Sequence, residues 1–304
     1  MSMCNNTFND TCKVDTLQGV GYAAVFLVGF LVNAAALRAF IAKRKSWTDM
    51  HIYMFNLAIA DFALVLFLPF RIYDAFFCLP KTCFCTFLIS IHFINMYASI
   101  YTTAAISFQR YLVVRFPLQA RLCRRKKETA FVVCLVIWVM LVVVCYIYRK
   151  ENYPDKLWTC YERCKDQPLK GNFIVILEIC GLVLPLLIVV FCSSRIIFIL
   201  KVDKKSMEKR STVAIVTANM IVFIACYLPI HIGFIVNYYN TVPKDWMCQV
   251  LPAHVYLQVA EWIASTNCCF DSISYYFLLK RFYSQVGTKT NSHSFRTMST
   301  MSSK

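Results

Sequence analysis

Seven long apolar stretches separated by short polar segments dominate the pattern of the chain. A helix needs about 20 mainly apolar residues to cross the hydrocarbon core of a bilayer. The stretches are Gln18–Ala42, Ile52–Phe76, Phe84–Val114, Ala130–Tyr148, Asn172–Leu200, Thr212–Asn240 and Val250–Leu279. The pattern predicts an all-α membrane protein, with one seven-helix domain over residues 18–279 and terminal segments at 1–17 and 280–304.

The basic residues are distributed unevenly between the two sides of this predicted bundle. The net charge of +16 would also suit a nucleic-acid-binding protein. However, nineteen basic residues fall in the segments on one side and nine on the other. This is the bias of cytoplasmic loops. We therefore expect a multi-pass plasma-membrane protein with an extracellular N-terminus, inner loops that attract anionic membrane lipid, and no nucleic-acid partner.

The outer segments carry signals of secretory processing. Asn5 and Asn9 each begin an Asn-x-Thr sequon, which predicts glycosylation. Eight of the 16 cysteines are expected at the outer face, where disulfides form, and the sequence alone leaves their pairing open. The chain shows no zinc-type Cys/His spacing, phosphate-binding glycine loop or Ser–His–Asp cluster. We therefore expect neither an enzyme, nor a metal centre, nor a resident cofactor.

Polar residues in the middle of the predicted spans form a candidate cation site. Asp61 and Asp271 lie mid-helix in the second and seventh spans, and Ser99 and Asn267 are further polar candidates. Carboxylates inside a membrane are rare and usually functional. Their oxygens could hold a monovalent cation together with water. The alternative is an interhelical hydrogen-bond network without an ion.

Several short motifs occur in a fixed order along the seven spans and together resemble the rhodopsin-like (class A) G-protein-coupled receptor family. The motifs are Gly29 with Asn33, Asn56-Leu57-Ala58-Ile59-Ala60-Asp61, Cys85, Gln109-Arg110-Tyr111, Trp138, Pro185, Cys226-Tyr227-Leu228-Pro229 and Asp271-Ser272-Ile273-Ser274-Tyr275. The resemblance covers nearly the whole chain. It implies a seven-helix bundle, a short amphipathic eighth helix over Leu279–Gln285, and nucleotide exchange on a heterotrimeric G protein.

The resemblance also implies roles for individual residues at the inner face. Arg110, Tyr111 and Tyr275 would couple to the G protein, and Tyr227 stands at the toggle position, where a tryptophan is usual. Gln109 and Lys209 stand where the family usually has acids that restrain the arginine, which predicts basal activity. The resemblance further implies sodium at Asp61, Ser99, Asn267 and Asp271. The tail, half Ser or Thr over Gly287–Lys304, is expected to recruit receptor kinases and arrestin once phosphorylated.

Two disulfides are expected, and the first of them is implied by the resemblance. The resemblance places a bond between Cys85 and Cys160, with Cys164 as a rival partner. A second bond is expected from Cys12 to Cys248.

The ligand is expected to be an anionic lipid or small acid. Four further segments resemble a narrower group of this family: Ile52-Tyr53-Met54-Phe55-Asn56-Leu57-Ala58, Leu68-Pro69-Phe70-Arg71, Leu228-Pro229-Ile230-His231-Ile232-Gly233-Phe234 and Asn267-Cys268-Cys269-Phe270-Asp271. The likeness is to the lysophosphatidylinositol receptor and its kynurenic-acid-responsive relative. Arg71 lies about 15 Å outward from Asp61 along its helix, and its guanidinium can take a phosphate or carboxylate. We expect a ligand pocket formed by Arg71, His92, Met96, Tyr97, Arg149, Glu178, His231 and Glu261.

The pairing of the charged pocket residues and the class of ligand both have alternatives. Glu261 is expected to pair with His92 or Arg71, and Glu178 with His231. Arg71 could instead serve only a structural salt bridge to Asp74 or Glu261. A peptide or chemokine receptor is the alternative function, although its usual acidic, tyrosine-rich N-terminus is missing here.

Overall fold

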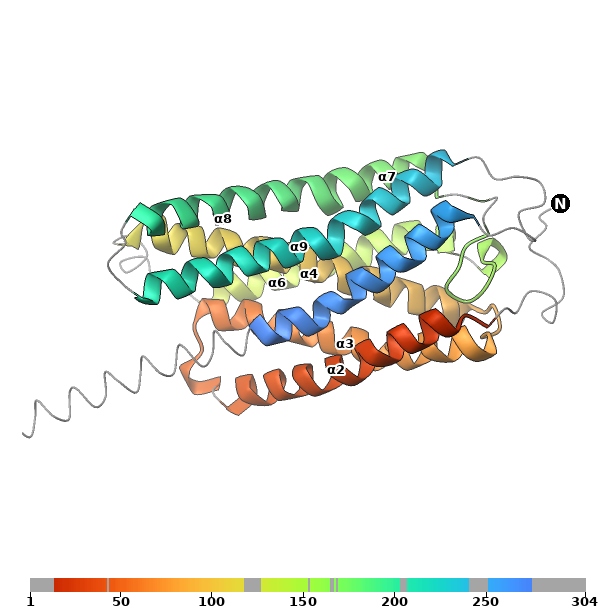
Figure 1. Cartoon of the computed structure of the whole chain (residues 1–304), viewed down its shortest axis with the longest axis horizontal. Coiled ribbons are helices and arrows are strands. Elements are labelled where there is room, and N and C mark those ends of the chain that lie inside the picture. Colours follow the sequence, from red (N-terminus) through yellow and green to blue (C-terminus); the bar gives the residue numbers. More distant parts are fainter. Residues whose placement is uncertain are drawn as a thin grey trace, which may run out of the picture.

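The computed structural model is a bundle of long helices aligned along one axis (Figure 1). It describes residues 14–42, 44–117, 127–152, 154–164, 167, 169–202, 207–240 and 251–274. Six described helices are long and apolar enough to cross a membrane. A seventh helix, over residues 252–274, runs between α9 and α2 and is drawn in blue in Figure 1. The predicted all-α seven-helix fold is confirmed.

The helix bounds follow the predicted spans within a few residues. The long helices are α2 (Thr16–Ala42), α3 (Asp49–Phe77), α4 (Cys83–Arg115), α6 (Lys127–Tyr148), α8 (Leu184–Val202) and α9 (Met207–Tyr239). Short helical turns occupy Arg44–Ser46 (η2), Arg149–Asn152 (η3) and Pro154–Lys156 (η4). An antiparallel bridge between Leu157 and Arg163 folds the second outer loop back on itself.

The fifth span is irregular at its outer end. It begins as α7 (Gly171–Ile176), widens into the π-helix η5 (Leu177–Val183) and continues as α8. Pro185 is the second residue of α8, just after η5, and has no backbone N–H to donate. Single π-turns are rare and occur often at functional sites. This one carries Glu178.

Polar side chains join the helices near the middle of the bundle. Trp138 Nε1 donates to Asn56 Oδ1 at 2.8 Å, and Asn56 Nδ2 donates to Thr102 Oγ1 at 3.1 Å, so α6, α3 and α4 are linked. Asn33 Nδ2 donates to the Cys268 carbonyl at 3.1 Å, and Ser272 Oγ donates to Asn33 Oδ1 at 2.6 Å. These bonds satisfy polar groups that would be costly if unpaired in lipid.

Some sequence predictions fall outside the described residues. These are the sequons at Asn5 and Asn9, the bond from Cys12 to Cys248, Tyr275, the eighth helix Leu279–Gln285, and the Ser/Thr-rich tail.

Candidate functional site

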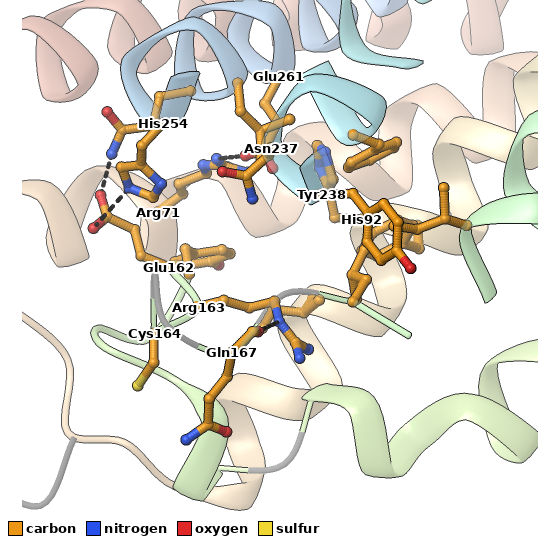
Figure 2. A pocket seen from close by; sticks show the side chains of 18 of the residues that line it. Arg71, His92, Glu162, Arg163, Cys164, Gln167, Asn237, Tyr238, His254 and Glu261 are labelled. Atoms are coloured by element: carbon orange, nitrogen blue, oxygen red, sulfur yellow. Dashed lines mark hydrogen bonds and ion pairs between the residues drawn. The ribbon is translucent and has the colours of Figure 1, made fainter. Parts of the chain in front are cut away.

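A cavity opens between the outer ends of the helices and the second outer loop (Figure 2). Helices α2, α3, α4, α7, α9 and 252–274 all contribute to its wall. The charged lining consists of Arg71, Arg163, Glu162 and Glu261, with His92 and His254 beside them. The apolar lining consists of Ile89, Phe93, Leu169, Ile174, Phe234 and Leu257.

Arg71 is the most enclosed charged group of this cavity. Its side chain is 6% exposed, and Nη2 donates to the Glu261 carboxylate (Figure 2). The guanidinium carbon lies 4.5 Å from the ring centroid of Tyr22 and 5.0 Å from that of Tyr161. Arg71 Nε is buried without a hydrogen-bond partner. Of the expected partners, Glu261 is therefore the one that pairs with Arg71. Asp74 instead accepts a bond from the backbone N–H of Leu79 at 2.8 Å.

The predicted ligand residues separate into two groups. Arg71, His92 and Glu261 line the outer cavity. Tyr97 and His231 form a second group with Glu178, whose side chain is 15% exposed, and the buried Tyr97 and His231 rings meet edge to face with their centroids 5.9 Å apart.

The second group contains the other expected pair. His231 Nδ1 lies 3.3 Å from Glu178 Oε1, which joins η5 to α9. The Tyr97 hydroxyl and His231 Nε2 are buried without partners. Met96 is also buried and borders a smaller interior cavity together with His92. His92 therefore lines both cavities.

Arg149 does not line the outer cavity. Its guanidinium lies 4.1 Å from the ring centroid of Tyr146 and donates to the Tyr146 carbonyl at 3.0 Å. The helix α6 ends at Tyr148 and the chain turns into η3, so Arg149 faces away from the bundle interior. Arg149 is exposed at the outer end of the bundle, and its role in attracting a ligand stays a prediction.

Several cavity residues were missed by the sequence analysis. On helix 252–274, Gln258 Nε2 donates to Glu162 of the loop, and His254 Nε2 lies 3.6 Å from Glu162 Oε2, beyond hydrogen-bond distance. His254, Gln258 and Glu261 follow an i, i+4, i+7 spacing, which places them on one helix face. That spacing is a signal that could have added the first two residues to Glu261.

The second outer loop is fastened above Arg71 by the predicted disulfide. Cys85, in the first turn of α4, is bonded to Cys160. The rival partner Cys164 is itself disulfide-bonded, so it is not available to Cys85. Tyr161 follows Cys160 directly, and its ring comes to lie against Arg71. Burial raises the pKa of the Tyr161 phenol above its usual range. The ring therefore meets the guanidinium as a neutral aromatic group.

The candidate cation site lies deeper in the bundle. Asp61, Ser99, Asn267 and Tyr227 border one small interior cavity. Ser99 Oγ donates to Asp61 Oδ1 at 3.1 Å, and Asp61 Oδ2 is buried without a partner. Such an oxygen is what a bound cation or water would satisfy. In the described part of the chain, no group of three or more His, Cys, Asp or Glu residues is placed so that it could hold a metal ion.

Asp271 joins this cavity indirectly. Asn267 Nδ2 donates to Asp271 Oδ2 at 2.6 Å and to the Tyr227 hydroxyl at 2.7 Å. Asp271 itself borders a second interior cavity, which also contains Arg110. Three of the four predicted sodium residues thus share a cavity. The fourth residue, Asp271, is connected to this cavity through its hydrogen bond with Asn267, which also bonds to Tyr227 at the toggle position.

The inner end of the bundle carries the predicted coupling residues. Arg110 borders its cavity with Ser107, Asn219 and Asp271. The neighbouring Gln109 donates from Nε2 to Asp49 Oδ2 at 3.5 Å, at the start of α3. The Tyr111 ring packs edge to face on Phe191, with the centroids 5.8 Å apart.

Comparison with known proteins gives a consistent result. The family profile "7 transmembrane receptor (rhodopsin family)" matches residues 32–275. The chain is 31% identical to G-protein coupled receptor 55 of Mus musculus, over 90% of this chain and 91% of that protein. It is 34% identical to G-protein coupled receptor 35 of Homo sapiens, over 86% and 84% of the two chains. It is 27% identical to lysophosphatidic acid receptor 4 of Mus musculus, over 91% and 80%.

Proposed function

Because the chain belongs to the rhodopsin family of seven-transmembrane receptors and is a G-protein-coupled receptor, we propose that its outer cavity binds an anionic lipid or a small organic acid. A lysophospholipid is the preferred class. The bound ligand would stabilise the active state by binding it more tightly than the resting state.

The amphipathic lining of the outer cavity carries this proposal. The α3 helix and helix 252–274 contribute Arg71 and Glu261, whereas α7 and α9 contribute Ile174 and Phe234. Ligand pockets are usually apolar with a few polar groups that fix orientation. An amphiphile with an acidic head and an apolar tail matches this lining. The likeness to a receptor named for lysophosphatidic acid adds support.

The peptide or chemokine alternative gains no support. None of the relatives named above carries a peptide or chemokine in its name. The outer cavity is also bordered by the loop residues Tyr161 and Glu162. We therefore keep the acidic ligand as the single proposed function.

The remaining roles follow the family pattern as proposals. Arg110, Tyr111 and Tyr275 would contact the G protein at the inner face of the plasma membrane, with the N-terminus outside. Sodium at Asp61, Ser99, Asn267 and Asp271 would favour the resting state. Receptor kinases and arrestin would act on the tail.

Replacing Arg71 tests the ligand class. Arg71→Ala removes the cation and is expected to lower agonist potency at least about tenfold, whereas Arg71→Lys keeps a cation and retains part of it. The measurement is G-protein activation by a panel of lysophospholipids and small acids, with surface expression determined for each variant. Full potency in Arg71→Ala would remove the case for an acidic ligand.

A further inference from the structure

Two aromatic rings lie close to the guanidinium of Arg71, so its N–H groups are the part that a ligand can bind. The guanidinium carbon lies 4.5 Å from the centroid of the Tyr22 ring and 5.0 Å from that of the Tyr161 ring. Glu261 occupies Nη2, and Nε has no hydrogen-bond partner. A guanidinium binds an acid through two N–H groups in its plane. An incoming acid must therefore approach beside Glu261 or replace it.

The charges of the outer cavity make either route unfavourable for a simple acid. Its described lining contains two arginines and two glutamates, so the charges of these four side chains balance and do not attract every anion. An acid that joins Glu261 places two anions around one cation. An acid that displaces Glu261 leaves a carboxylate that is only 21% exposed without its partner. A partly buried charge that loses its partner is strongly disfavoured.

We propose that the Arg71–Glu261 pair is a two-part head-group site. It selects ligands in which a hydroxyl or ammonium donor lies next to the acidic group. The acid binds the Arg71 guanidinium in its plane, and the donor binds the Glu261 carboxylate, so both partners stay satisfied. This inference rests on the proposed function and narrows its ligand class.

The neighbouring side chains fit such a head group. His92 lines the cavity with its Nε2 buried and unpartnered. Gln18 contributes a neutral amide from α2. Both can hydrogen-bond to a hydroxylated head without adding charge. A head group without donors would leave Glu261 in competition with its own acid for Arg71.

Matched probes test the requirement for a donor. Hexadecyl phosphate carries an acid alone, whereas hexadecyl glycerol phosphate carries the same chain and acid with one hydroxyl. The glycerol probe is expected to be about tenfold more potent, as one hydrogen bond to a charged group allows. The O-methylated glycerol probe keeps the size and loses the donor. It is expected to behave like hexadecyl phosphate.

Variants of the pair test whether the preference for a ligand with a hydrogen-bond donor depends on Glu261. Glu261→Gln removes the competing anion, so the potency of hexadecyl phosphate should rise until the two probes differ by no more than about threefold. Glu261→Asp keeps the charge and should keep the preference. Glu162→Gln is the matched control, because it removes an equal charge from the same cavity without touching the pair, and it should also keep the preference.

The outcomes separate this inference from the proposed function. Equal potency of the hydroxyl and O-methyl probes on the wild-type receptor would overturn the two-part site while leaving the acidic ligand class intact. An unchanged probe ratio in Glu261→Gln at normal surface expression would do the same. If no acidic amphiphile or small acid activates the wild type, the proposed function is wrong, and this inference, which rests on it, is wrong as well.

Discussion

At the scale of single residues, buried polar groups that share one partner are the most informative feature. Asn267 donates to both Asp271 and the Tyr227 hydroxyl. A tryptophan at position 227 has only an indole N–H and could not accept such a bond. Tyr227 therefore links the toggle position directly to the candidate sodium site.

Sodium dependence tests that site. Agonist affinity of the wild type is expected to fall as sodium replaces a larger cation at constant ionic strength, because sodium would bind the resting state more tightly. Asp61→Asn removes the carboxylate that borders the cavity and should abolish the sodium effect. The measurement is competition binding on membranes. Affinity that does not depend on sodium in the wild type would count against the site.

The residue before Arg110 tests the expectation of basal activity. Gln109→Asp supplies the acid that the family usually has there, and it should lower basal nucleotide exchange through a partly exposed ion pair worth roughly 0.2–1 kcal/mol. Gln109 lies 3.5 Å from the Asp49 carboxylate, so the new acid would be repelled by Asp49. We therefore expect a larger decrease in the Asp49→Asn background. An unchanged baseline in both backgrounds would contradict this explanation.

At the scale of elements, the close approach between η5 and α4 shapes the group formed by Tyr97, His231 and Glu178. A Cβ added at Gly181 would lie 2.5 Å from Tyr97 Cε1. The Tyr101 hydroxyl donates to the Cys180 carbonyl at 2.9 Å, beside this contact. The π-helix thus brings its backbone against α4 where Glu178 reaches across to His231.

Substitution at this glycine tests the role of that contact. Gly181→Ala should destabilise the purified receptor by about 1–3 kcal/mol, because the buried tyrosine ring must move. The measurement is thermal unfolding in detergent. Val183→Ala, at an exposed position of the same π-helix, is the control and should change the melting temperature little. Equal shifts for the two variants would show that the close approach is not what matters.

At the scale of the whole molecule, the receptor has two polar ends joined by an apolar bundle. The outer cavity is held by the disulfide-linked second loop, and the inner cavity contains Arg110 and Asp271. The polar cavity around Asp61 lies between these in the described helices, and His92 borders both it and the outer cavity. Polar residues therefore border three cavities in succession from the ligand side toward the inner face. His92 borders the first two, and the bond between Asn267 and Asp271 connects the second to the third.

The Ser/Thr-rich tail is expected to act separately from this bundle. Each phosphate would add about −1.5 to −2 charges. Truncation after Gln285 should therefore reduce agonist-dependent arrestin recruitment by most of its amplitude and leave nucleotide exchange unchanged. The two readouts are measured on the same cells with matched surface expression. A parallel loss of exchange would mean that the tail also supports coupling.

The sequence by itself determined the seven spans and the depth of each polar residue. Apolar length sets how many helices cross a bilayer, and a constant rise per residue sets how far Arg71 lies from Asp61. Ordered motifs on those spans were enough to predict the family. The same reasoning placed Arg71 and His92 correctly in the outer part of the bundle.

Only the tertiary structure decided which side chains meet. Arg71 pairs with Glu261, 190 positions away, rather than with Asp74 on its own helix. Tyr161 lies against Arg71 because a disulfide fastens its loop to α4. Arg149 turns outward, while Tyr97 and His231 lie apart from the outer cavity. Depth along a helix follows from counting residues, but the rotation of each helix and the path of each loop depend on packing between elements distant in the chain.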